Sequence, residues 1–279
     1  MKRHAVVVSM MCVFALACGK GTAGNNGGDG GGNGKGAGGG SGGGAAMGYS
    51  GTASQALRFG ATMGSDGLVS ADPVNPNTRT IAGWYRMKAS MVTSDRQMTA
   101  WALQLPAPST SYQELNNAWH ADQWELEDSV QGGFLFAPID MSWWFVAETN
   151  DLMGPNGPET KLYFKKEGDP MLTLVSGNTH PQLDGVTRFL IGIDDDGSAG
   201  WMDGDIAGVK VWSAVLTEGE LEAESQQMSP KRTMDLHAFY PLQATDSMLN
   251  DASGNHHDLT SLSTSGSWSV QTGPAIVWK

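Results

Sequence analysis

Apolar and polar residues alternate along much of residues 49–279, which is the pattern of β-strands that bury one face. Residues 78–87 show it most clearly, because one face of that segment carries Ile81, Gly83, Tyr85 and Met87. Similar short runs predict strands at residues 98–105, 133–137, 143–149, 161–166, 171–175, 187–193 and 205–212. Glycine, proline, asparagine and aspartate separate these runs, so the pattern predicts an all-β sandwich.

The spacing of these runs also predicts how some of them pair. Residues 161–166 and 171–175 are joined by a Glu-Gly-Asp-Pro turn and predict a hairpin. Residues 187–193 and 205–212 predict a second pair, joined by a turn-rich segment. Residues 143–149 are continuously apolar at their start, which favours a central strand that is covered on both faces.

One short helix is predicted directly after the last of these strands. Thr217 and Glu220 have the spacing of a capping box, and Leu216 and Leu221 have that of a hydrophobic staple. We expect the helix to run to about residue 227 and to stop before Pro230.

The first seventeen residues have the character of an export signal. Lys2 and Arg3 precede an apolar run over residues 5–17, which is too short to span a bilayer as a helix. The run ends in Ala-Leu-Ala-Cys at Cys18, which resembles the lipobox of bacterial lipoproteins. The resemblance implies cleavage before Cys18, lipidation of its thiol and, because Gly19 follows, transport to the outer membrane. An ordinary signal peptide with a chance cysteine is the alternative.

Residues 18–48 then form the lipidated cysteine and a glycine-rich segment that is too poor in apolar residues to fold, so we interpret it as a disordered tether. It precedes a single domain at residues 49–279. The two cysteines are Cys12 and Cys18, so we expect no disulfide in that domain. The chain has a formal net charge of -12, which argues against nucleic acid as a partner and leaves the lipid as the means of membrane contact.

Several motifs follow one another in a consistent order. In residues 204–217 a strand with Gly, Ile, Val and Trp leads through Leu-Thr into an acidic helix. The other motifs are residues 56–59, 80–85, 143–147, 162–163, 240–242 and 251–259. In this order they resemble the laminin-G-like, or concanavalin A-like lectin and glucanase, jelly-roll domains. The resemblance implies a two-sheet antiparallel jelly roll of the kind that binds glycans or proteins and in some members holds calcium. Residues 106–131 have no counterpart, and we expect them to be an insertion at one rim.

The best catalytic candidate is the segment Trp-Glu-Leu-Glu-Asp at residues 124–128. Jelly-roll glucanases of the laminarinase type carry Glu-x-Asp-x-(x)-Glu on one strand, with the carboxylates facing one cleft. Glu125 and Glu127 would share a face, but no third carboxylate follows at Ser129 or Val130. We therefore interpret the segment as a solvated charged loop and predict no complete catalytic set.

Acidic turns are the candidate calcium sites, because Ca²⁺ accepts oxygen ligands from flexible loops. Aspartate and asparagine also favour turns through their own side-chain hydrogen bonds, so turn chemistry is the alternative at each of them. The candidate ligands are Asp194, Asp196, Asp203, Asp205, Asp251 and Asn255. The adjacent His256 and His257 are interpreted as part of a polar turn, since neighbours on a strand point to opposite faces.

The chain has ten tryptophans, which either fill a sandwich core or stack on sugar rings. Trp84, Trp143, Trp144 and Trp212 lie in strong strand patterns and are assigned to the core. Trp119, Trp124 and Trp201 lie in polar, loop-like contexts and are the ligand-contact candidates, with packing at the rim as the alternative.

These observations favour a surface-anchored lipoprotein whose non-catalytic domain binds a glycan or a cell-surface protein. Two alternatives remain: a carbohydrate-active enzyme of the glycoside hydrolase kind on the same fold, and a structural envelope lipoprotein.

Overall fold

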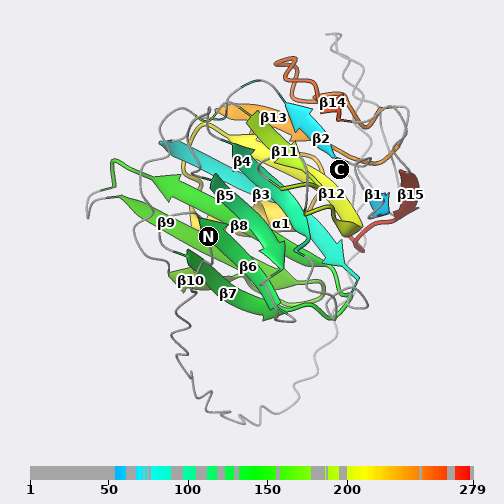
Figure 1. Ribbon diagram of the computed structural model, residues 1–279. Helices are drawn as coiled ribbons and strands as arrows, with labels where there is room; N and C mark the ends of the chain where they lie inside the picture. Colours follow the sequence, from blue (N-terminus) through cyan, green and yellow to red (C-terminus); the bar gives the residue numbers. More distant parts are fainter. Residues whose placement is uncertain are drawn as a thin grey trace, which may run out of the picture. The chain divides into compact units, whose positions relative to one another are not determined.

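Two antiparallel β-sheets pack around an apolar core (Figure 1). The computed structural model describes residues 54–60, 67–70, 72, 74, 77–88, 97–104, 112–117, 123–128, 132–154, 158–176, 186, 188–194, 200–244, 247–262 and 268–276. All of them belong to one unit, Met47–Lys279. Cys18 and the predicted signal and tether lie outside the described residues.

Sheet A has the strand order β10 (Thr173–Ser176), β9 (Glu159–Lys166), β8 (Trp144–Asp151), β3 (Thr78–Met87), β12 (Asp203–Trp212), β1 (Gln55–Gly60) and β15 (Ser269–Thr272), and β13 (Leu236–Tyr240) also pairs with β12. Sheet B has the order β14 (Thr260–Ser261), β2 (Leu68–Ser70), β11 (Arg188–Ile191), β4 (Thr99–Gln104), β5 (Tyr112–Asn117), β6 (Gln123–Asp128) and β7 (Gly132–Pro138). The predicted two-sheet antiparallel jelly-roll sandwich is therefore confirmed.

The main core lies between the sheets, because alternate residues of their strands point inward. Ile81 and Tyr85 of β3 pack in it with Trp101 of β4 and Leu115 of β5. The core assignment of tryptophans is also confirmed, since the side chains of all four are buried: Trp84, Trp143, Trp144 and Trp212.

Helix α1 (Glu218–Ser225) contributes to a second apolar cluster with the outer face of sheet A, through Leu221 against strand residues such as Trp84 and Trp212. Its start is the predicted capping box: Thr217 Oγ1 accepts a hydrogen bond from the backbone N–H of Glu220, and the Glu220 carboxylate accepts one from the backbone N–H of Thr217 at 2.8 Å. Sheet A is thus covered on one face by sheet B and on part of the other by the helix.

A buried ion pair joins the helix to the sheet. Lys210 Nζ of β12 lies 2.7 Å from Glu224 Oε2 of α1, and it also donates to the backbone oxygens of Glu224 and Gln227. Both side chains are almost completely buried, so each charge needs the other.

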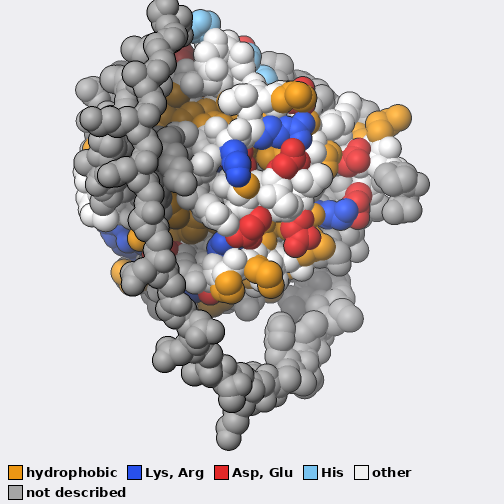
Figure 2. Space-filling model, turned by 180° about the vertical axis from the view of Figure 1, so that it is seen from behind, with side chains coloured by type: hydrophobic (Ala, Val, Ile, Leu, Met, Phe, Trp, Pro, Cys, Tyr) orange, Lys and Arg blue, Asp and Glu red, His pale blue; other side chains and the backbone are white. Residues whose placement is uncertain are grey.

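The surface of the molecule also carries charged side chains of both signs. On the face drawn in Figure 2, basic side chains lie beside acidic ones.

A β-bulge at Gly208 makes this arrangement possible. Pairing of β12 with β3 shifts register between Ala207 and Lys210, and Gly208 has a φ of 60°. Before the bulge Ile206 faces the main core, and after it Val209 and Val211 do so. The extra residue therefore turns Lys210 outward, toward α1, instead of into the core.

Two predictions about the strands were wrong. Residues 106–131 are not a rim insertion, because they contain β5 and β6, which pair within sheet B. The predicted pairing of residues 187–193 with 205–212 also fails, since β11 lies in sheet B and β12 in sheet A. The chain crosses from one sheet to the other between these strands, as jelly rolls do. The β9–β10 hairpin is confirmed.

Within the described part of the chain, we find no helix that is long and apolar enough to cross a membrane.

The Gly208→Ala substitution should lower the free energy of unfolding by about 1–2 kcal/mol, because a side chain at positive φ is strained and its Cβ would lie 3.1 Å from Met228 Cε. Gly219→Ala is the matched control. Its Cβ meets open space in the first turn of α1, so we expect no loss, or a gain of up to about 1 kcal/mol. Urea unfolding of both variants measures the difference, and equal effects would contradict the role given to the bulge.

Candidate functional site

Polar side chains gather on the outer face of sheet B, over β5 and β6. On β5 and β6, Leu115, Trp124 and Leu126 point into the main core. The residues between them point outward because side chains alternate along a strand. We call this side of the two strands the β5–β6 polar face, and it consists of Tyr112, Glu114, Asn116, Glu125 and Glu127. Tyr112, Glu125 and Glu127 are partly exposed, whereas Glu114 and Asn116 are buried beside them.

The Glu127 carboxylate is held by donors from β5. Tyr112 Oη donates to Glu127 Oε1 at 2.8 Å, and Asn116 Nδ2 donates to Glu127 Oε2 at 2.8 Å. Gln97 Nε2 lies 3.4 Å from the same Oε2. Three donors therefore fix the position of this acceptor before any ligand arrives.

Glu114 brings a further carboxylate to the same point, because it lies opposite Glu127 in the β5–β6 register. Asn116 Nδ2 donates to Glu114 Oε1 at 2.9 Å, so oxygens of both carboxylates lie within 2.9 Å of one nitrogen. Gln97 Nε2 also donates to Glu114 Oε1, and Thr99 Oγ1 lies 3.3 Å from Glu114 Oε2. The neighbouring strand thus places a buried second carboxylate beside Glu127.

Asn116 is fully buried, and only the nitrogen of its side-chain amide takes part in the hydrogen bonds described above. Its Nδ2 donates to both carboxylates, whereas its Oδ1 has no hydrogen-bond partner among the described residues. A buried acceptor without a partner costs about 1–3 kcal/mol. Because this oxygen is buried, Asn116 orders the two carboxylates and is not itself placed to contact a ligand.

Glu125 differs from its neighbours in charge. Its side chain is half-buried, and burial together with the nearby Glu127 carboxylate raises the pKa of Glu125 to about 7. The carboxyl group lies against β7, where a Cβ at Gly133 would overlap it. Glycine at that position makes room for Glu125. Near neutral pH, both the charged and the neutral form of the Glu125 carboxyl group are therefore populated.

The prediction that Trp124 contacts a ligand from a polar loop was wrong, because Trp124 is a buried residue of a strand. Trp124 is in β6 and only 1% exposed, and its ring packs beside Tyr85 with centroids 6.2 Å apart. The polar residues around it in sequence face outward, which makes the segment look like a loop. Residues 124–128 were also predicted to be a charged loop, which is wrong because they belong to strand β6. The expectation that Glu125 and Glu127 share a face of that strand is confirmed.

The other two tryptophan candidates lie apart from this face or outside the structure. Trp201 is half-buried against an apolar cluster that includes Leu190 and Ile193. Trp119 lies outside the described residues.

The predicted calcium ligands are mostly bonded to protein groups. Asp203 pairs with Lys88 at 2.7 Å, and Asp205 pairs with both Arg58 and Arg86. Asp194 is half-buried, and Asp196 lies outside the described residues. In the described ranges no group of three His, Cys, Asp or Glu side chains could hold a metal. Calcium remains a prediction that rests on the loop containing Asp194 and Asp196.

Asp251 organises the turn that precedes the adjacent histidines. Its carboxylate accepts backbone N–H groups of Phe239, Ser253 and His257, which holds the pKa of Asp251 below its usual value against the effect of burial. The Asn255 amide donates to the backbone oxygens of residues 236 and 237. These bonds agree with the alternative of turn chemistry.

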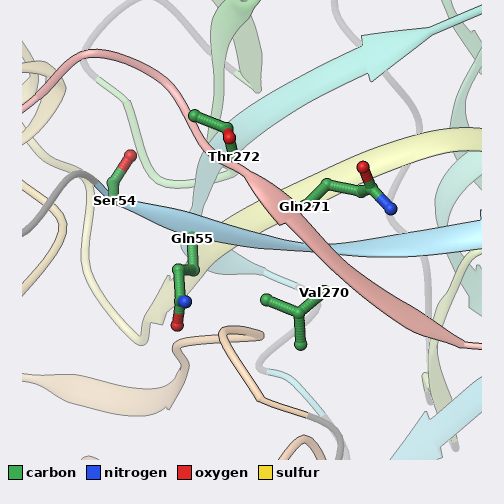
Figure 3. Close-up of a pocket in the computed structure, with 5 residues that line it drawn as sticks. All are labelled: Ser54, Gln55, Val270, Gln271 and Thr272. Carbon is green, nitrogen blue, oxygen red and sulfur yellow. The ribbon is translucent and has the colours of Figure 1, made fainter.

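The cavity drawn in Figure 3 offers little chemistry. It measures about 340 Å³ and lies along the β1–β15 pair, lined by Ser54, Gln55, Val270, Gln271 and Thr272. Gln55 and Val270 point to one side of the paired strands, and Gln271 points to the other (Figure 3). Because these side chains diverge, they do not converge on one ligand atom.

No protein-family model matches the chain, and no curated protein matches it in sequence. A solved structure from Bacteroides ovatus, of a protein proposed to bind carbohydrate, is 18% identical, with a TM-score of 0.51 over 81% of this chain and 62% of that one. This chain therefore spans less than two thirds of that protein. A SAP-like pentraxin of Limulus polyphemus is 10% identical, with a TM-score of 0.47 over 78% of this chain and 95% of that one. The mouse laminin alpha1 LG4-5 domains are 10% identical, with a TM-score of 0.39 over 58% and 43%. The similarity is one of fold, an antiparallel jelly-roll sandwich.

Glu125→Gln should stabilise the protein at pH 8 but not at pH 5. The pKa of Glu125 is about 7 in the folded protein and 4.5 for the reference group, so the folded state loses stability as the pH rises through this interval. Glutamine removes that loss, which is on the order of 1 kcal/mol after allowance for solvent screening. Thermal unfolding at both pH values measures it. Glu159→Gln, an exposed carboxylate on β9, is the control and should show the same small effect at both.

Proposed function

We propose that this chain is an exported, lipid-anchored protein whose jelly-roll domain binds a glycan at the β5–β6 polar face. The observation that carries the proposal is the fixed network of Glu114, Asn116 and Glu127, with Tyr112 as donor. A cell-surface protein is the other class of partner that the sequence leaves open.

The chemistry of the network suits sugar hydroxyl groups. A hydroxyl both donates and accepts, and ionised carboxylates supply acceptors only. The partly exposed Glu127 is held in place by protein donors, so a bound sugar would not have to order it. The buried Glu114 and Asn116 support it from within the sheet.

The fold supports the proposal only in general terms. Jelly-roll sandwiches carry both binding modules and enzymes, so the function must be argued from the site. The protein of Bacteroides ovatus proposed to bind carbohydrate has a similar fold at 18% identity. The residues of the β5–β6 polar face, rather than this similarity, are the basis of the proposal.

Glycoside hydrolysis is the second candidate function, and one observation favours it. The pKa of Glu125 is raised to about 7 beside Glu127, and a hydrolase needs one carboxyl group in its neutral form next to one that is ionised. Glu114 adds a third carboxylate at the same place. Binding without cleavage stays the first candidate, because β6 lacks the third carboxylate of the glucanase pattern, with Ser129 and Val130 at the positions where it would follow.

Export and anchoring form the remaining part of the proposal. The apolar run before Cys18 and the glycine-rich segment after it support lipidation and display of the domain at a distance from the membrane. Outer-membrane or cell-surface display would bring the domain into contact with glycans outside the cell.

A glycan array should find ligands for the native chain, and Glu127→Gln should weaken the best of them about tenfold or more, because Tyr112 and Asn116 would lose their shared acceptor. Titration calorimetry with that glycan measures the loss. Glu159→Gln removes the same charge from β9 and should bind as the native chain does. Binding that is equal in both variants would contradict the assignment of the site. Repeating the array with EDTA tests the calcium prediction.

Incubation of the same glycan with the native chain separates the two candidate functions. New reducing ends that disappear in Glu125→Gln would establish hydrolysis and end the binding-only proposal. If the glycan stays intact after incubation and still binds, the result supports the proposal of binding without cleavage.

Replacement of Cys18 by serine should abolish incorporation of labelled palmitate and release the protein from the membrane fraction, because the thiol that accepts the lipid is lost. Cys12→Ser is the control, since Cys12 lies inside the predicted signal and should leave labelling unchanged. Labelling of the Cys18→Ser variant at the native level would refute the anchor.

A further inference from the structure

A second polar pocket lies on the outer face of sheet A, away from the β5–β6 polar face. It measures about 230 Å³ and is lined by Arg58, Arg86, Met87, Lys88, Met141 and Asp205. Three of the six are cations: Arg58 of β1, Arg86 of β3 and Lys88, which directly follows β3, and β12 lies between the two strands. This volume lies below the usual range for a ligand site, about 300–1,000 Å³, and suits one small group.

The carboxylates that pair with these cations, Asp205 in the pocket and Asp203 beside it, are more buried than the cations. The side chain of Asp205 is 1% exposed, whereas those of Arg58 and Arg86 are 25% and 28% exposed. Lys88, which pairs with Asp203 at 2.7 Å, is 37% exposed. Three cations against two carboxylates leave a positive excess at the surface of a chain whose net charge is -12.

Both arginines bind the same carboxylate and still have donors to spare. Arg58 donates to Asp205 through Nε and Nη2, and Arg86 does so through Nε at 2.7 Å, with its Nη2 2.6 Å from Oδ2. A guanidinium has five N–H groups. Among the described residues, the other N–H groups of these two arginines have no hydrogen-bond partner. Asp205 thus fixes both guanidiniums in orientation while leaving part of each for a ligand.

The pocket is also rigid on two sides. The Arg86 guanidinium lies over the buried Trp143 ring, 4.6 Å from its centroid. Met141 has a φ of 61° and is 57% exposed, within a turn that Asp140 holds by accepting from the Ser142 N–H at 3.1 Å. A strained non-glycine residue at the wall of a pocket is often kept for a function. A pocket fixed in this way need not be ordered by its ligand.

We propose that this pocket binds the carboxylate group of a small anionic ligand, for which a uronate serves as the probe. Two planar guanidinium forks match a planar carboxylate, and the ammonium of Lys88 adds a point charge. A single arginine would neutralise the buried Asp205, so the second arginine and Lys88 are not needed for that purpose. The proposal does not depend on glycan binding at the β5–β6 polar face, which lies on the other sheet.

Titration of the full chain with sodium glucuronate tests the proposal, with glucose as the neutral control. We expect saturable binding of glucuronate in the millimolar range, at least about tenfold tighter than that of glucose, and weaker at high salt. Inorganic sulfate at equal ionic strength should compete less well. No saturable binding of glucuronate, or equal binding of glucose or sulfate, would overturn the proposal.

Variants locate the binding. Arg58→Gln and Lys88→Gln should each weaken glucuronate binding about tenfold, whereas Lys161→Gln, which removes a similarly exposed cation from β9, should leave it unchanged. Lys88→Gln spares the Asp205 network and so keeps the test valid if Arg58→Gln unfolds. Glu127→Gln should bind glucuronate normally, which separates this site from the one under Proposed function. If Lys88→Gln and a folded Arg58→Gln variant both bind glucuronate as tightly as the native chain, the proposal that the ligand binds in this pocket is refuted.

Discussion

Strand β12 is buried at all ten of its positions, and three of its residues are charged. Each charge must therefore meet an opposite charge within the protein, because an unpaired buried ion is very costly. Lys210 meets Glu224 and so joins α1 to the sheet, whereas Asp205 meets Arg58 and Arg86 and so brings two cations to one pocket. The position of the helix and the chemistry of the outer face of sheet A both follow from this requirement.

The two outer faces of the sandwich consequently have different characters. Part of sheet A is closed by α1 and its apolar cluster, and what remains of the described outer surface there includes paired charges. Over β5 and β6, sheet B instead presents carboxylates and amides that are hydrogen-bonded to one another. The same fold therefore offers an acceptor-rich surface on one sheet and a donor-rich pocket on the other. Ligands of different charge could be recognised without competing for residues.

Local signals in the sequence were sufficient for some elements and not for others. The alternation of residues 78–87 and the capping box at Thr217 depend on nearby residues, and both were predicted. Residues 112–128 look polar because one face of β5 and β6 is made of carboxylates and amides. The convergence of Glu114 with Glu127 depends on cross-strand register, which a single sequence does not specify. The prediction that consecutive strands pair was also wrong for β11 and β12, because they belong to different sheets.

The bulge at Gly208 has a consequence for how this protein can evolve. It divides β12 into two segments whose inward and outward positions are out of phase, with Asp205 in one and Lys210 in the other. Each segment can accept substitutions suited to its own neighbours. Loss or gain of one residue between them would exchange the faces of a whole segment and turn a lysine into the apolar interior. In this strand, length should be under stronger selection than residue identity.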